Sequence, residues 1–226
     1  MHRLFIALFL ALSWASSLEA APCYGTRMPA KHKFSVGLQN HTLLKRYLED
    51  NRGKVRSLQN LLLLSYGVYD WLSIDLKGGA GYIMQHPVAG DEVDYASGFA
   101  GGYGLRVRLL DIDKWKVVSG FQHISVHPRG THLEGVENKA ILDDWQVSLL
   151  GSYSLGRFTP YLGSRWSRID YIHRVEGERK RRMSDFTKDI GLVFGTDLSL
   201  TDNIRLNLEG SFLDSDAFAA SVNYDF

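Results

Sequence analysis

Apolar and polar residues alternate with a period of two along most of the chain from Lys33 onward. The clearest stretch is 72–85, in which one face carries Leu72, Ile74, Leu76, Gly78, Ala80, Tyr82 and Met84, and the other Ser73, Asp75, Lys77, Gly79, Gly81 and Gln85. Successive side chains of a β-strand point to opposite faces, so this alternation predicts strands. One apolar and one charged face are typical of a closed barrel with lipid outside and a polar lumen.

Breaks in the alternation divide the chain into strands. Strands are predicted at 33–48, 55–66, 72–85, 97–110, 114–127, 142–155, 158–175, 186–200, 204–213 and 217–226. The facing of 114–127 stays undecided, because either register leaves an apolar residue inward. Short turns alternate with longer polar loops, which is typical of transmembrane barrels. We therefore predict an all-β, up-and-down antiparallel transmembrane β-barrel of about ten strands (8–12), with both chain ends on the short-turn side.

The first twenty residues are typical of a cleaved signal peptide. A basic start precedes an apolar stretch at 4–14 and smaller residues before Ala20, so we expect cleavage after Ala20. An alternative makes Cys23 the acylated residue of a lipoprotein, although Pro22 stands where a small residue is expected. The chain then divides into a signal peptide (1–20), a short, poorly ordered periplasmic lead (21–32) and a barrel domain (33–226).

The composition excludes several classes of function. Lys and Arg together number 26 and Asp and Glu 25, so no global field favours a nucleic acid partner. The single cysteine excludes an internal disulfide and a multi-cysteine metal site. We expect no cofactor and no metal.

The C-terminal strand ends in an aromatic residue on its apolar face, which carries Phe218, Val222, Tyr224 and Phe226. This pattern resembles the C-terminal assembly signal of bacterial outer-membrane β-barrels, the porin-like superfamily. The resemblance implies export to the outer membrane of a Gram-negative-type cell, recognition by the barrel-assembly machinery, and contact with outer-membrane lipid. We expect a monomer. The alternative is a soluble, secreted all-β protein.

Several charges fall on the face predicted to point inward: Asp75, Lys77, Arg106, Arg108, Arg165, Asp189, Asp197, Arg205 and Glu209. Both signs are present, and unpaired buried charges are costly, so we expect them to pair across the lumen. Barrels of about eight strands are filled by their own side chains, and ten strands add little room. The pattern favours a lumen plugged by charged side chains, in a protein of structural, adhesive or minor-conduit role.

One short motif raises the question of catalysis. His123 and Ser125 form a His-x-Ser sequence, and Glu137 follows. The motif is similar to that of outer-membrane lipid A deacylases, which implies Ser125 as nucleophile, His123 as base and Glu137 as the residue orienting it. Val126 stands where that family has Asn, and the motif is mid-chain. We expect no enzyme, no carboxylate close enough to orient His123, and a solvated strand-end role for His127.

The segment 174–182 is strongly basic. Its cations are Arg174, Arg179, Lys180, Arg181 and Arg182. Arg and Lys bind phosphate well, so we expect these residues to contact lipopolysaccharide if the loop faces the cell exterior.

Overall fold

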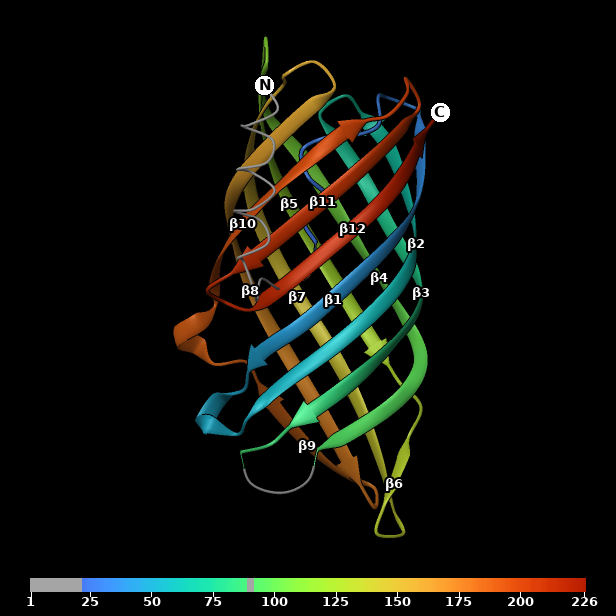
Figure 1. Ribbon diagram of the computed structural model, residues 1–226, viewed down its shortest axis with the longest axis vertical. Helices are drawn as coiled ribbons and strands as arrows, with labels where there is room; N and C mark the ends of the chain where they lie inside the picture. The colour runs from blue at the N-terminus through green and yellow to red at the C-terminus, as the bar shows by residue number, and fades with distance from the viewer. Residues whose placement is uncertain (1–21, 89–91) are drawn as a thin grey trace, which may run out of the picture.

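The computed structural model describes residues 22–88 and 92–226, and these residues form a closed antiparallel barrel of ten strands (Figure 1). The barrel strands are β1 (Phe34–Tyr47), β2 (Lys54–Tyr69), β3 (Leu72–His86), β4 (Val93–Ile112), β5 (Trp115–His127), β7 (Val136–Tyr153), β8 (Phe158–Val175), β10 (Ile190–Ser199), β11 (Ile204–Phe212) and β12 (Asp216–Asp225). Each strand pairs with its successor in this order, and β12 pairs with β1 to close the sheet. The predicted fold and strand number are confirmed.

The two ends of the barrel differ, and we name them the turn end and the loop end. Tight turns and the C-terminus lie at the turn end (Figure 1). The loop end carries two hairpin extensions, in which β6 (Thr131–Leu133) pairs with the start of β7 and β9 (Glu178–Met183) pairs with the end of β8. Two short 3-10 turns, η1 (Glu49–Asn51) and η2 (Phe186–Lys188), also lie there. No helix in the described residues is long and apolar enough to span a membrane.

The η2 turn is capped by an acidic side chain. The hydroxyl and the backbone N–H of Thr187 donate to the Asp185 carboxylate, at 2.7 and 3.0 Å, and hold the pKa of Asp185 below its usual value. This cap fixes the chain as it enters β10.

The period-two facing follows the sequence pattern. On β3, Ile74 is 47% exposed on the outer face, whereas Asp75 is 1% exposed inside. The structure also decides the facing of β5, which sequence left open. Gln122, Ile124 and Val126 point inward and are buried, so Ser125 and its neighbours in the same register face outward.

Part of the interior towards the loop end is apolar, which differs from the uniformly polar lumen we expected. Its cluster includes Val55, Ile83, Tyr95, Leu142 and Tyr171, all buried. In a barrel this narrow, side chains from opposite walls meet and exclude water, so apolar residues can face inward. The register that puts Ile124 and Val126 inside therefore buries them in this cluster.

The expectation of a periplasmic lead at 21–32 was wrong for residues 22–27, which lie inside the barrel. The Cys23 amide N–H donates to Glu209 Oε1 at 2.5 Å, and Thr26 Oγ1 donates to Ser152 Oγ at 2.6 Å. Polar wall groups out of contact with water need partners, and the backbone of this segment supplies them. Cys23 is 3% exposed within the lumen, which counts against the lipoprotein alternative. The expected signal peptide and its cleavage site lie outside the described residues.

A local turn lets this segment enter. Tyr24 and Gly25 both have left-handed backbones, with φ of 67° and 66°. A Cβ at Gly25 would lie 2.9 Å from Asp197 Oδ2, so glycine satisfies both the conformation and the close approach.

Candidate functional site

Charged residues line the interior, and the structure brings most of the predicted ones together. Those inside and buried are Asp75, Lys77, Arg106, Arg165, Asp189, Asp197, Arg205 and Glu209. Arg106 forms a two-pronged pair with Asp75, with Nε to Oδ2 at 2.8 Å and Nη2 to Oδ1 at 2.7 Å. Arg205 Nη1 donates to Asp197 Oδ1 at 3.0 Å. Hydrogen-bonded pairing of both signs offsets the desolvation of each charge.

Arg108 does not belong to this set. Its Nη1 donates to Asp111 Oδ2 at 3.0 Å, in an exposed pair three residues apart. Arg108 is directly opposite the inward-facing Val118, but its side chain is 17% exposed and pairs with Asp111, which lies nearer the β4–β5 turn.

Sequence reasoning missed two members of a second charge cluster near the loop end, Arg46 and Asp214, which pair there with the predicted Asp189 and Arg165. Asp214 Oδ2 accepts from Arg165 Nη2 at 2.6 Å and lies 3.2 Å from Arg46 Nη1. The Arg46 and Asp214 side chains are almost fully buried. By alternation Arg46 would face outward, but a β-bulge after Leu43 reverses its facing. Asp214 comes from the β11–β12 loop, whose inward course no local pattern indicates.

The inserted segment 22–27 contributes an aromatic ring to the lumen. Lys77 Nζ lies 3.9 Å from the centre of the Tyr24 ring, and the Arg106 guanidinium lies 5.1 Å from it. Arg106 Nη1 also donates to the Arg27 carbonyl at 2.6 Å. Two cavities beside Tyr24 have volumes of about 10 Å³ each, roughly the minimum of about 10–15 Å³ that one water molecule needs.

The His-x-Ser motif lies on the outer face of β5, towards the loop end. Ser125 Oγ lies 2.7 Å from His127 Nε2 and donates to the carboxylate of Asp143 on β7. His123 Nε2 lies 3.7 Å from Asp143 Oδ1, which is within ion-pair distance but longer than a hydrogen bond. The expectation that no carboxylate orients His123 stays a prediction. His127, expected to be merely solvated, also contacts Ser125.

The predicted carboxylate, Glu137, is not part of this group. It lies on the β6–β7 hairpin and pairs with Lys139 at 2.9 Å. Asp143 was missed because β5 and β7 pair in a register that places it directly opposite Ser125, which no sequence spacing indicates. In a Ser-His-Asp triad the imidazole stands between the hydroxyl and the carboxylate. Here the Ser125 hydroxyl stands between His127 and Asp143.

The basic segment forms the β8–β9 hairpin, whose two faces carry different cations. Arg174 and Arg179 are a directly opposed pair and exposed. Arg181 donates to the Asp170 carboxylate. Lys180 and Arg182 lie on the other face, opposite His173 and Tyr171. The expected cluster is thus divided, and its glycolipid contact remains a prediction.

Aromatic side chains cover the outer face at the turn end. The Tyr69 and Trp71 rings stack at 5.5 Å, and the Tyr224 and Phe226 rings lie 4.8 Å apart. Phe218 and Val222, also predicted for the assembly signal, face outward with Tyr224 and are exposed. This placement suits a lipid-facing strand, and the role as an assembly signal remains a prediction.

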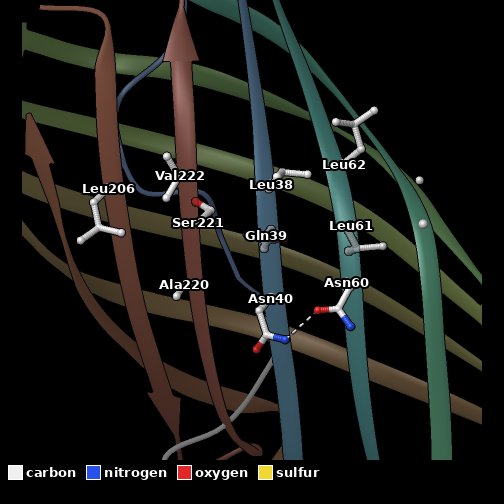
Figure 2. A pocket seen from close by; sticks show the side chains of 12 residues that line it. Leu38, Gln39, Asn40, Asn60, Leu61, Leu62, Leu206, Ala220, Ser221 and Val222 are labelled. Carbon is white, nitrogen blue, oxygen red and sulfur yellow. Dashed lines mark hydrogen bonds between the residues drawn. The ribbon is translucent and has the colours of Figure 1, made fainter. Parts of the chain in front are cut away.

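A shallow groove crosses the outer face of β3, β2, β1, β12 and β11 (Figure 2). Its volume is about 580 Å³, and it is lined by Leu38, Leu62, Gly78, Gly79, Leu206 and Val222, among others. Asn40 Nδ2 donates to Asn60 Oδ1 at 2.9 Å at its edge, as the dashed line in Figure 2 marks. The amide pair satisfies part of its own hydrogen bonding on an otherwise apolar surface.

No group of three or more His, Cys, Asp or Glu side chains that could hold a metal ion occurs within residues 22–88 and 92–226. The prediction that no metal is bound is not tested by this finding.

Comparison with known proteins identifies the fold. The chain matches no protein-family model and no curated protein. Among solved structures, the transport unit of the autotransporter AIDA-I from Escherichia coli is similar, with 11% identity, a TM-score of 0.51, and coverage of 96% of this chain and 97% of that one. The translocator domain of NalP from Neisseria meningitidis has 11% identity over 100% and 94% of the two chains, with a TM-score of 0.44. An outer membrane channel from Pseudomonas putida F1 has 12% identity over 92% of this chain and 100% of that one, with a TM-score of 0.44. The fold is that of outer-membrane β-barrels.

Proposed function

We propose that this protein is an integral outer-membrane β-barrel whose lumen is closed to solutes and which acts through its outer face and loop-end hairpins. Its role is then structural or adhesive. The observation that carries the proposal is the filled interior. Segment 22–27 and paired charges occupy the turn-end half, and an apolar cluster together with the buried ion pairs of Asp214 occupies the loop-end half. The minor-conduit role that the sequence left open finds no support in cavities of about 10 Å³.

The outer face supports the membrane location. Large apolar side chains are exposed around the barrel, and the aromatic rings near the turn end suit a membrane–water boundary. We assign the turn end to the periplasm and the loop end to the cell exterior, since short periplasmic turns and longer external loops are the rule for such barrels. Removal of a signal peptide at 1–20 and recognition of the C-terminal strand by the assembly machinery belong to the same proposal, as does a monomeric state.

Conductance across a planar lipid bilayer tests the closed lumen. Folded protein is first identified in the outer-membrane fraction, by its faster migration on a gel before boiling than after. The same material added to a bilayer should leave the current at the lipid baseline. Steady, voltage-independent steps of ion current would contradict the closed lumen, even if the outer-membrane location held.

A second candidate function is hydrolysis of an acyl ester in an outer-leaflet glycolipid. The observation that favours it is the 2.7 Å contact between Ser125 Oγ and His127 Nε2 on the lipid-facing side of the barrel. Ser125 would be the nucleophile and His127 its base, because a hydroxyl needs a base within about 2.6–3.2 Å. Against it, Asp143 contacts the serine rather than orienting His127.

Lipid A mass separates the two candidates. We expect lipid A from cells producing the protein to be unchanged in mass, in keeping with a non-enzymatic barrel. Loss of one acyl chain in these cells, and its retention in cells producing Ser125→Ala at equal folded level, would establish the hydrolase instead.

A further inference from the structure

Three cations lie in one row across the loop-end strands. Lys139 on β7 is directly opposite Arg174 on β8, and Arg174 is directly opposite Arg179 on β9. Directly opposed residues of antiparallel strands project from the same face, with Cβ atoms about 4.5–5.5 Å apart. All three are exposed, and Lys139 shares the outward register of Trp145. Like charges so placed repel each other, and the row therefore costs the isolated protein stability.

The protein's own carboxylates relieve this repulsion only in part. Glu137 pairs with Lys139 at 2.9 Å. In the part of the chain that the structure describes, neither Arg174 nor Arg179 forms an ion pair with Asp or Glu. The nearby Asp170 carboxylate is bound to Arg181 instead. A net positive charge therefore remains in the middle of the row.

A crevice adjoins this row on the outer face. It has a volume of about 190 Å³ and is lined by His127, Pro128, Gly130, Lys139, Ile141 and Arg174. Two cations and an imidazole thus share a small enclosure with apolar walls. Below it, the outward register of β7 continues through Ile141, Asp143 and Trp145 towards the lipid-facing belt, and the Asp143 carboxylate accepts a hydrogen bond from Ser125. A ligand with an anionic group and an attached apolar chain would place its anionic group in the crevice and its apolar chain along the outer face of β7.

We infer that the crevice and the cationic row bind the phosphate group of an anionic membrane lipid, with its acyl chain along the outer face of β7. Guanidinium groups bind phosphate through two parallel N–H donors, so the phosphate would join Arg174 to its neighbours and remove the like-charge repulsion. The inference rests on the proposed membrane location. It also changes the set of residues predicted to contact a glycolipid. The set now includes Lys139 and no longer includes Lys180 and Arg182, which lie on the opposite face of the hairpin.

A matched pair of double variants tests the site. Arg174→Gln with Arg179→Gln removes two cations from the row, whereas Lys180→Gln with Arg182→Gln removes two from the opposite face of the same hairpin. Both change net charge equally. Each protein is folded in neutral-lipid vesicles, and its binding of lipid A, phosphatidylglycerol and inorganic phosphate is measured separately. We expect affinity for at least one of the two lipids to fall about tenfold or more in the row variant, and less than about twofold in the control.

The three probes distinguish the sources of the phosphate. Binding of lipid A alone would identify a glycolipid, and equal binding of phosphatidylglycerol would identify anionic lipids in general. Equal weakening by both double variants would overturn the site, because only diffuse charge would then matter. Inorganic phosphate bound as tightly as either lipid would overturn the lipid assignment. Failure of the wild type to reach the membrane fraction would instead contradict the proposed function.

Discussion

Substitution of Asp214 by Asn should destabilise the barrel strongly, because this carboxylate is shared by two buried guanidinium groups. It accepts from Arg165 Nε and Nη2 at 2.9 and 2.6 Å, and from the Ser167 hydroxyl at 2.6 Å. It also lies 3.2 Å from Arg46 Nη1. An amide keeps the shape of the side chain but removes its charge and turns one acceptor into a donor that faces arginine.

The size of the effect follows from burial. The side chains of Arg165 and Asp214 are 0% exposed, so water cannot replace the lost interaction. Removing one member of a buried, hydrogen-bonded ion pair costs about 3–5 kcal/mol. Asp189, 3.4 Å from Arg46, remains as a partner for that arginine, which places our expectation near 3 kcal/mol, at the lower end of this range.

Asp216→Asn is the matched control. Asp216 lies two residues further on and pairs with Lys45 at 2.9 Å, but the lysine side chain is 36% exposed. Pairs in contact with water contribute about 0–1 kcal/mol. Urea unfolding of the folded proteins in lipid vesicles, followed by the difference in gel mobility before and after boiling, measures both free energies of unfolding. Equal losses in the two variants would refute the argument that Asp214 holds a buried charge cluster together.

Three further predictions concern the outer surface and the last strand. Gly78→Val should be tolerated or slightly stabilising, because a Cβ there meets nothing within 4 Å. Gly79→Val should prevent folding, because its Cβ would lie 2.0 Å from a backbone carbonyl oxygen of β2. The folding yields of the two variants in lipid vesicles are compared. Leu76→Arg should cost about 2–4 kcal/mol in the same urea assay, as a charge facing lipid near the midplane does, and a loss below that of Leu76→Met would contradict the outward facing. Phe226→Asp should leave export intact but block assembly, so that the processed protein accumulates unfolded in the periplasm. Wild-type amounts of the variant in the outer membrane would argue against a role for the terminal aromatic residue.

The local pattern of the sequence was enough to predict the barrel itself. Strand positions, their number and the facing of residues such as Ile74 and Asp75 follow from period-two alternation, because each strand presents one face to lipid and the other to the interior. The outward facing of Phe226 follows for the same reason. These properties depend on residues adjacent in the chain, so they can be inferred without knowing which strands meet.

Only the tertiary structure decided what fills the barrel and what gathers on its outer face. A β-bulge turns Arg46 inward against the alternation, and Asp214 reaches it from a loop far away in the sequence. Segment 22–27 enters the lumen because its backbone satisfies polar groups that separate strands supply. The pairing register of β5 with β7 brings Asp143, rather than Glu137, to Ser125. Each of these contacts depends on register and closure, and closure is a property of the whole sheet that short stretches of sequence do not encode.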